Sequence, residues 1–286
     1  MSRDAVRALN ERAGCNLELL GLVEQGQSGA AYVRWPDGRD AVVTTALTTL
    51  EHMQQTAEVL AALKTKGLPV PEHEFLLPLD DGTIAVVQER LPGSTVAAPD
   101  TPHVHALITL NERFAGLLAS RPDVPTPRLS LGRPTDAIPA ELIERHSARA
   151  RRLLRHIRDT ADGGQAIEGG DLVHVDLTVP NALFDTDGAI SGLVDWNYGV
   201  ARGDRHYGLV KLLHNLSHAA MTADGDQHPT RQAVDHAAQM ATAVLDPTTL
   251  RRYWAHQSLN MLYASIRWGT EDAVQTYLEL GESRLS

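Results

Sequence analysis

The pattern of hydrophobic residues changes near residue 92, and this change restricts the folds that the chain can adopt. Before it, short β-branched segments alternate with turn residues, whereas after it apolar residues recur mainly at helical spacing. Two parts of different secondary structure therefore follow one another along the chain. We expect an α+β fold with two domains, residues 1–92 and residues 93–286.

The first part is expected to be a small antiparallel sheet with one helix. A helix is predicted over residues 49–64, where apolar residues recur at helical spacing before Gly67 and Pro69. Turns containing aspartate and glycine are typical of the hairpins that would join neighbouring strands. The predicted strands are 17–23, 30–35, 40–46, 75–79 and 83–91.

The second part is expected to be larger and mostly helical. Asp246 and Pro247 indicate a helix start, because aspartate accepts hydrogen bonds from free N–H groups and proline fits the first helical position. Loops are predicted for 121–134 and 160–171, and one hairpin is predicted within 183–196. The predicted helices are near 103–120, 139–160, 206–220, 229–245, 247–268 and 270–280.

Composition excludes several classes of protein. With 43% hydrophobic and 22% charged residues, the 286-residue chain can bury a substantial core. A net charge of −10 disfavours nucleic-acid binding, which needs a basic face. No apolar run approaches the roughly 18 residues of a membrane span, and the single cysteine, Cys15, cannot form an internal disulfide or a cysteine-based zinc site. We expect a cytoplasmic protein with no nucleic-acid or membrane partner.

Polar residues with a defined spacing lie between the predicted helices. His174 and Asp176 are separated by one residue, and Asn181 follows after four more. Asp195 comes at the end of the second strand of the predicted hairpin. Grouped oxygen donors of this kind suit Mg²⁺, which takes one or two carboxylates together with water and phosphate oxygens. The same spacing is found in the catalytic loop and metal-binding aspartate of kinases.

Three segments, HVDLTVPNALF, GLVDWNYG and RGD, occur in the order typical of one family. The chain resembles the aminoglycoside phosphotransferase family, the antibiotic-kinase branch of the protein-kinase-like fold. The resemblance implies two lobes: a nucleotide-binding N-terminal lobe at 1–92 and a catalytic and substrate-binding C-terminal lobe at 93–286. Within the family, the chain is most similar to the viomycin and capreomycin phosphotransferase type.

The resemblance implies a role for each polar residue of the motif. Asp176 would accept or orient the proton of the attacking substrate hydroxyl, and Asn181 and Asp195 would hold Mg²⁺. His174 would brace the catalytic loop, and Asp204 would order the loop after Asp195, with direct contact to the substrate as the alternative for Asp204. A polar turn is the alternative for the aspartates, and a helix cap or Asx-turn is the alternative for Asn181.

The resemblance also implies a nucleotide site in the first part of the chain. Gly26, Ser28 and Gly29 would form a loop over the phosphates, although the same stretch could be only a hairpin turn. Glu89 and Leu91 belong to a segment whose backbone groups would contact adenine. ATP is the expected phosphoryl donor, and GTP is not excluded.

The chain departs from the family pattern in its catalytic loop and in its phosphate-binding lysine. Val175 replaces a glycine, and a β-branched residue predicts extended backbone there, because φ > 0 would strain it. No lysine occurs at the end of the third strand, where Val43, Thr44 and Thr45 stand. Its expected glutamate partner is lost as well, since Thr56 lies near that place and Glu58 is the nearest carboxylate.

Three further points concern charged residues. Arg34 or Arg39 could replace the missing lysine at the phosphates. The family often carries a second aspartate four residues after Asp204, where this chain has Gly208. Lysine is scarce in the chain, which contains only Lys64, Lys66 and Lys211.

The resemblance implies an ATP- and Mg²⁺-dependent O-phosphotransferase that inactivates a cationic antibiotic. The acidic composition suits a cationic substrate. The absent lysine favours a basic cyclic peptide of the viomycin or capreomycin type over an aminoglycoside. A small-metabolite kinase of the same fold and a nucleotide-binding pseudokinase are the alternatives.

Overall fold

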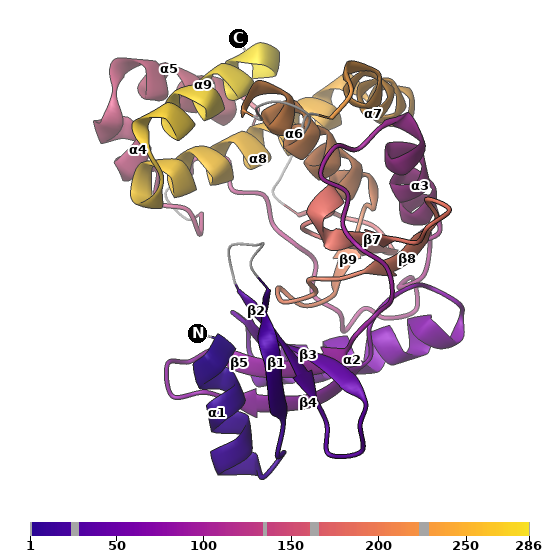
Figure 1. Ribbon diagram of the computed structural model, residues 1–286. Helices are drawn as coiled ribbons and strands as arrows, with labels where there is room; N and C mark the ends of the chain where they lie inside the picture. The colour runs from indigo at the N-terminus through magenta and orange to yellow at the C-terminus, as the bar shows by residue number, and fades with distance from the viewer. Residues whose placement is uncertain (1, 24–28, 134–135, 161–165, 223–228, 286) are drawn as a thin grey trace. The chain divides into compact units, whose positions relative to one another are not determined.

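The computed structural model describes residues 2–23, 29–133, 136–160, 166–222 and 229–285 (Figure 1). Its contacts divide the chain into two compact units. The first comprises Met1–Val96 and Pro180–Val200, and the second comprises Ala97–Val179 and Ala201–Ser286. The boundary expected at residue 92 left 180–200 in the second lobe, whereas these residues group with the first unit by their contacts.

The first unit contains the expected antiparallel sheet, with five strands in the order β1-β2-β3-β5-β4. The helix α2, Leu50–Thr65, follows β3, as predicted, and its N-terminus is capped by the side chain of Thr49. The register places Val43 opposite Ala31 on one neighbouring strand and opposite Val87 on the other. The strands are β1 Glu18–Val23, β2 Ala30–Arg34, β3 Asp40–Ala46, β4 His73–Pro78 and β5 Ile84–Glu89.

A helix that the sequence analysis did not anticipate, α1 at Ser2–Ala13, covers one face of this sheet. Its buried residues Ala5, Val6 and Leu9 pack in one cluster with Val33 and Val43. Their spacing is helical, so the signal was present in the sequence, between charged residues. Burial of this apolar stripe against the sheet stabilises a helix that is too short to be stable alone.

The opposite face of the sheet is covered by α2. Met53 of α2 is fully buried with Ala46, Ile84 and Val86. Because successive residues of a strand point to opposite faces, Val86 faces α2 while its neighbour Val87 belongs to the cluster under α1. The sheet is therefore covered on both faces at β3 and β5, whereas β1 is largely exposed.

A short antiparallel pair of strands completes the first unit, β7 at Ala182–Phe184 and β8 at Ile190–Leu193. This is the hairpin predicted within 183–196. The segment that follows β8 is anchored on α2: the ring of His52 bonds to the carbonyl of Val200 at 2.8 Å, and the Val200 N–H donates to Thr56 Oγ1 at 3.0 Å. Two hydrogen bonds to Val200 therefore fix this segment to α2.

Gly199→Ala is expected to destabilise the first unit by about 2 kcal/mol more than Gly188→Ala. Both glycines have a left-handed backbone, with φ of 80° and 79°. A Cβ at Gly199 would lie 2.4 Å from Cε1 of His52, whereas nothing lies within 4 Å of a Cβ at Gly188. The difference between the two variants in urea unfolding measures this contact. Equal losses would show that the His52 ring moves aside freely.

The second unit is mostly helical, as expected, but several helices differ from their predicted bounds, and α9 extends five residues beyond 280, to Leu285. The helix predicted near 103–120 ends at Glu112, and the left-handed Gly116, with φ of 66°, lies shortly after its end. The helix predicted for 139–160 is two helices, because extended Ser147 caps the second of them by accepting from the Ala150 N–H. The helices are α3 Thr101–Glu112, α4 Ala140–His146, α5 Ala148–Arg158, α6 His206–Thr222, α7 Arg231–Val244, α8 Pro247–Trp268 and α9 Glu271–Leu285.

The start of α8 and a small sheet fix further parts of the second unit. Asp246 caps α8 as predicted, accepting from the N–H groups of Thr248 and Thr249 at 2.9 and 3.0 Å. An unanticipated antiparallel pair joins β6, Asp171–Val173, to β9, Ala201–Gly203. Among the described residues, none of the helices is both long enough and apolar enough to span a membrane.

Candidate active site

The predicted catalytic loop begins directly after β6, in the second unit. His174 is 2% exposed, which agrees with a buried and structural position. Val175 and Asp176 lie in a turn. The φ of Val175 is not positive, which is the condition that its β-branched side chain imposes. Leu177 is fully buried, and it fixes the loop against the interior of the unit.

Asp176 forms an ion pair with a lysine that the sequence analysis did not include in the site. Lys211 Nζ, on α6, lies 2.9 Å from Asp176 Oδ1. The side chains are only 17% and 27% exposed, respectively, so solvent screens this pair less than a surface pair. Scarcity of lysine was the only signal in the sequence that could have singled out Lys211.

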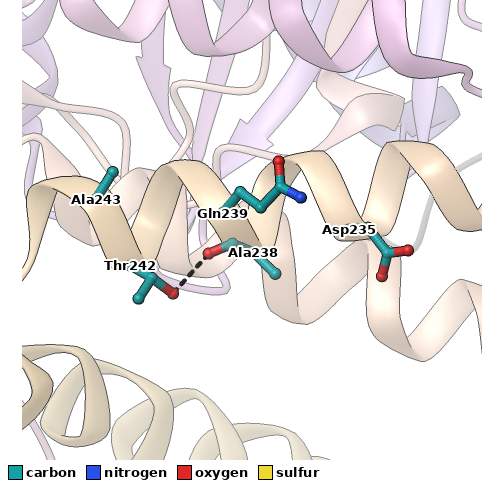
Figure 2. A pocket seen from close by; sticks show the side chains of 5 residues that line it. All are labelled: Asp235, Ala238, Gln239, Thr242 and Ala243. Carbon is teal, nitrogen blue, oxygen red and sulfur yellow. Dashed lines mark hydrogen bonds between the residues drawn. The ribbon is translucent and has the colours of Figure 1, made fainter.

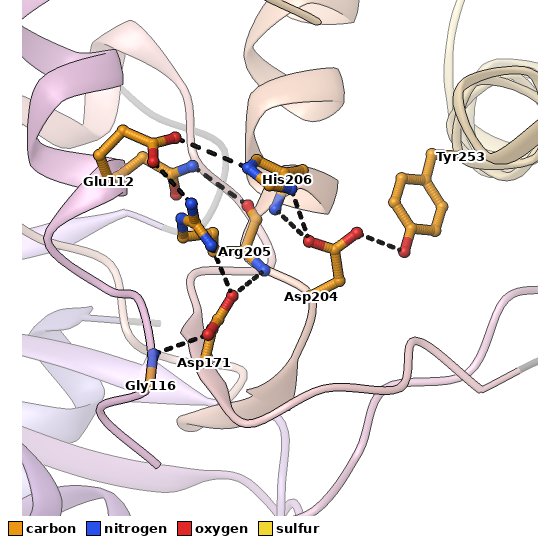
Figure 3. Close-up of polar contacts among 8 residues, drawn as sticks. Glu112, Gly116, Asp171, Asp204, Arg205, His206 and Tyr253 are labelled. Atoms are coloured by element: carbon orange, nitrogen blue, oxygen red, sulfur yellow. Dashed lines mark hydrogen bonds and ion pairs between the residues drawn. The ribbon is translucent and has the colours of Figure 1, made fainter. Parts of the chain in front are cut away.

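Asp204 belongs to a polar network that joins β6, α3, α6 and α8 (Figure 3). It accepts from the His206 N–H at 2.9 Å and from the Tyr253 hydroxyl at 3.0 Å. The next residue, Arg205, lies 3.0 Å from Asp171 and 2.6 Å from a carboxylate oxygen of Glu112. Burial opposes ionisation of Asp204, but its hydrogen bonds with His206 outweigh it and lower the pKa of this carboxyl.

This network holds the two ends of the segment 171–204 in the second unit. Asp171 accepts from the Gly116 N–H at 2.7 Å, and it begins β6, which leads into the catalytic loop. Asp204 follows β9 and precedes α6. Asp204, which was predicted to order the loop after Asp195, is therefore a half-buried carboxylate that accepts hydrogen bonds from several donors.

Three buried histidines are expected to make the protein less stable in mild acid. Burial lowers the pKa of His214 to about 3 and the pKa values of His73 and His256 to about 4. Below the ordinary value of 6.5 the unfolded chain takes up protons on these rings, whereas the folded chain keeps them neutral. Stability present above pH 6.5 is therefore lost as the pH falls from 6.5 towards 4, by up to about 1.4 kcal/mol per pH unit for each histidine.

Urea unfolding at pH 7 and at pH 5.5 measures this loss. The lower pH lies above the range in which ordinary carboxylates titrate, so the three rings dominate the change. An unchanged free energy of unfolding between the two pH values would contradict the prediction.

Asn181 and Asp195 lie in the first unit, next to the paired strands β7 and β8. Ala182 is opposite Leu193 in the register, and the carbonyl of Asn181 accepts from the Val194 N–H at 2.9 Å. The backbone therefore brings Asn181 to the end of β8, one residue from Asp195. An amide oxygen and a carboxylate are oxygen donors of the kind that Mg²⁺ takes, so these residues fit that ion.

The backbone at Asp195 is unusual. Its φ is 64°, a left-handed conformation that costs most residues about 1–2 kcal/mol and that aspartate tolerates better. The next residue, Trp196, is 2% exposed, and its Nε1 donates to the Leu193 carbonyl at 3.0 Å. Such local strain is concentrated at functional sites, where surrounding contacts maintain it. In the part of the chain that the structure describes, no group of three or more His, Cys, Asp or Glu side chains could hold a metal ion alone.

Threonines stand where the family pattern has its lysine and glutamate, and both bond to the segment after Asp195. Thr44 Oγ1 donates to Asn197 Oδ1 at 2.9 Å, and both side chains are buried. Thr56, on α2, accepts from the N–H of Val200. Neutral hydrogen bonds therefore connect β3 and α2 to this segment, in positions where the family pattern has an ion pair.

The residues predicted to contact nucleotide lie in the first unit or outside the described residues. Gly26 and Ser28 are outside them, whereas Gly29 precedes β2 with a φ of 62°. The Glu89 N–H donates to the Glu72 carbonyl at 2.8 Å, and the Glu89 carboxylate pairs with Lys64. Leu91 follows β5 and lies against Gly192 of β8.

The two arginines considered as substitutes for the missing lysine are engaged elsewhere. Arg34 lies 2.9 Å from Asp40, and Arg39 contacts Asp37 and Glu74, each at 2.8 Å. Both flank the turn between β2 and β3, whereas Gly29 precedes the opposite end of β2. The structure therefore does not favour either arginine as a phosphate ligand.

Figure 2 shows a hollow in the second unit that is separate from all predicted site residues. Thr242 Oγ1 donates to the Ala238 carbonyl at 2.8 Å within it, and its only carboxylate is that of Asp235. Its lining residues all lie on α7: Asp235, Ala238, Gln239, Thr242 and Ala243. This lining offers no cation to a phosphate, and we assign it no role.

Solved structures of antibiotic-modifying enzymes share this fold along nearly the whole chain. Aminoglycoside phosphotransferase APH(4)-Ia is 16% identical with a TM-score of 0.69, and the match covers 99% of this chain and 98% of that one. Amicoumacin kinase hAmiN is 12% identical with a TM-score of 0.66, covering 99% and 96%. Aminoglycoside-3'-phosphotransferase of type VIII is 22% identical with a TM-score of 0.51, covering 98% of each chain.

At these identities the likeness establishes the fold, which is the protein-kinase-like fold of the aminoglycoside phosphotransferases. The expected fold class is thereby confirmed. The model of the phosphotransferase enzyme family matches residues 20–241. The chain therefore belongs to this family and is a phosphotransferase. No curated protein matches the chain in sequence.

Proposed function

We propose that the chain is an ATP- and Mg²⁺-dependent O-phosphotransferase that phosphorylates a hydroxyl of a cationic antibiotic. The observation that carries the proposal is the placement of Asn181 and Asp195 beside the ends of β7 and β8, with Asp195 in a left-handed conformation. In this scheme both side chains hold Mg²⁺, which neutralises charge on the phosphates. Asp176 accepts or orients the proton of the substrate hydroxyl, and buried His174 braces the loop.

The nucleotide is assigned to the first unit. Gly26, Ser28 and Gly29 cover its phosphates, and the backbone around Glu89 and Leu91 contacts its base. Since the Glu89 N–H is already bonded to Glu72, Leu91 is the better donor of the two. ATP is the proposed phosphoryl donor. A solved relative, aminoglycoside 2'-phosphotransferase-IIIa, was determined in complex with GDP, so GTP is tested as well.

A basic cyclic peptide of the viomycin or capreomycin type is the proposed substrate, with an aminoglycoside second. The net charge of −10 favours a cationic substrate by long-range attraction. Among the solved relatives, one complex of APH(4)-Ia contains hygromycin B, and hAmiN is an amicoumacin kinase. These relatives support an antibiotic as the class of acceptor.

A nucleotide-binding pseudokinase is favoured by one observation, the replacement of the expected ion pair by Thr44 and Thr56. Asp176, Asn181 and Asp195 speak against it, since a binding protein that transfers no phosphoryl group needs no such set. A kinase for a small metabolite is the third possibility, and substrate screening separates it from the first.

The test is a panel of viomycin, capreomycin, hygromycin B and amicoumacin with Mg²⁺ and ATP or GTP. Mass spectrometry is expected to show the addition of one phosphoryl group (HPO₃) to a cationic antibiotic, and a metal chelator is expected to abolish it. Nucleotide binding without transfer to any antibiotic or metabolite would favour the pseudokinase.

A further inference from the structure

The contact between α6 and the catalytic loop places a cation on Asp176. Lys211 Nζ lies 2.9 Å from Asp176 Oδ1, and less than a third of either side chain is exposed. Both residues belong to the second unit, so the contact lies within one compact body. Removing two charges from water is costly, and an ion pair in this position offsets part of that cost only if both partners are present.

A glycine on α6 allows the helix to approach the loop closely. A Cβ at Gly208 would lie 3.2 Å from Cδ2 of Leu177 and 3.3 Å from Oδ1 of Asn111. Leu177 is the neighbour of Asp176, and Lys211 follows Gly208 by three residues, on the same face of the helix. Where the family often has an aspartate, this chain therefore has a close helix contact, with a cation one turn later.

The helix that carries Lys211, α6, is fixed by contacts at its start and near its middle. At its start, His206 bonds to Asp204, which also accepts from the hydroxyl of Tyr253 on α8 (Figure 3). About one helical turn after Lys211, the buried His214 packs against Trp254, with ring centroids 4.8 Å apart. Lys211 thus projects from a fixed element, which is what a geometrically defined contact with a reacting group requires.

Three titratable side chains that interact with this pair, Tyr207, His214 and His256, are neutral at pH 7. Burial raises the pKa of Tyr207, whose environment includes Asp176, and lowers the pKa values of His214 to about 3 and of His256 to about 4, both near Lys211. Lys211 is therefore the charged member of this group of neighbours. The other two lysines lie at the end of α2, in the first unit, where Lys64 pairs with Glu89 and Lys66 is exposed.

We propose that Lys211 is a positioning residue for phosphoryl transfer, whose ammonium group orients the Asp176 carboxylate and keeps it ionised. The inference rests on the proposed role of Asp176. As the substrate oxygen bonds to the γ-phosphorus, the bond to the leaving ADP oxygen breaks with its electron pair, and the hydroxyl proton passes to Asp176. Lys211 keeps its own proton throughout. A cation beside a carboxylate favours the ionised form, the form that can accept this proton.

The first experiment measures the ion pair without any turnover. Reductive methylation with ¹³C-formaldehyde labels the lysines and keeps their charge, and only three lysine signals arise from this chain. Lys→Arg variants assign them. Asp176→Asn is expected to shift the Lys211 signal while leaving the Lys66 signal unchanged, because it removes the carboxylate that the Lys211 ammonium group contacts. A Lys211 signal that does not change in Asp176→Asn would overturn the inference.

The second experiment measures transfer by Lys211→Met, with Lys211→Arg as the conservative variant and Lys66→Met as the matched control. Lys211→Met is expected to lower kcat by roughly 100-fold, with the Kd for Mg-ATP within about twofold of wild type. The acidic limb of the kcat profile moves to higher pH, because loss of the cation raises the pKa of the carboxyl. Lys211→Arg recovers most of kcat, and Lys66→Met has no effect.

Three outcomes separate the inference from the proposed function. Normal kcat and a normal pH profile in a folded Lys211→Met variant overturn the inference alone. Weakened Mg-ATP binding with unchanged kcat also overturns it, since that result describes a phosphate ligand. Absence of transfer by the wild-type enzyme overturns the proposed function, and the lysine signals still report on the ion pair.

Discussion

Asp176→Asn is expected to lower kcat by about a thousandfold, with little change in the Kd for Mg-ATP. Asparagine keeps the shape of the side chain but cannot accept the proton of the substrate hydroxyl, and general-base catalysis of this kind contributes on the order of 10²–10⁴ in rate. The substitution also leaves Lys211 without its carboxylate partner. Steady-state kinetics with the best antibiotic of the panel, together with nucleotide binding at equilibrium, checks both expectations.

The control for Asp176→Asn is Asp187→Asn. Asp187 is an exposed residue in the turn between β7 and β8, so the same chemical change is made outside the proposed site. Thermal unfolding of both variants shows whether loss of the ion pair affects stability. Full turnover by a folded Asp176→Asn variant would remove Asp176 from the mechanism.

Asp195→Asn is expected to lower kcat at least 100-fold and to raise the Mg²⁺ concentration that gives half-maximal activity. The substitution removes one negative charge from the proposed metal site, and a bound metal stabilises transition-state charge by several kcal/mol. Asparagine is the appropriate replacement, since it tolerates the φ of 64° at this position better than alanine. A loss of activity caused by backbone strain is thereby avoided.

Titration of activity with Mg²⁺ measures this effect, and binding of Mn²⁺ in the presence of nucleotide measures it without turnover. The metal dependence of Asp187→Asn should match that of wild type. If Asp195→Asn keeps the wild-type dependence on Mg²⁺, then Asp195 is not a metal ligand, whatever happens to kcat.

Most secondary structure could be predicted because its signals are local. The turn between β2 and β3, the cap at Asp246 and the periodicity of α2 each depend on residues within one or two turns of one another. Four features were missed, one of which is the pairing of β6 with β9. The helix α1 has few apolar residues, the interruption at Ser147 is a cap inside a continuous periodic pattern, and α3 ends well before residue 120.

The sequence alone determined the family, the α+β fold and the spacing of Asp176, Asn181 and Asp195, because these residues lie close together along the chain. Only the tertiary structure decided which contacts are made in place of the missing lysine–glutamate ion pair and which cation lies beside Asp176. It joined Thr44 to Asn197 and Lys211 to Asp176, contacts that span 153 and 35 residues, respectively. No local pattern encodes such pairs, since they depend on how a helix and a strand pack against distant segments. The lysine missing from β3 is visible in the sequence, whereas the cation beside Asp176 is visible only in the fold.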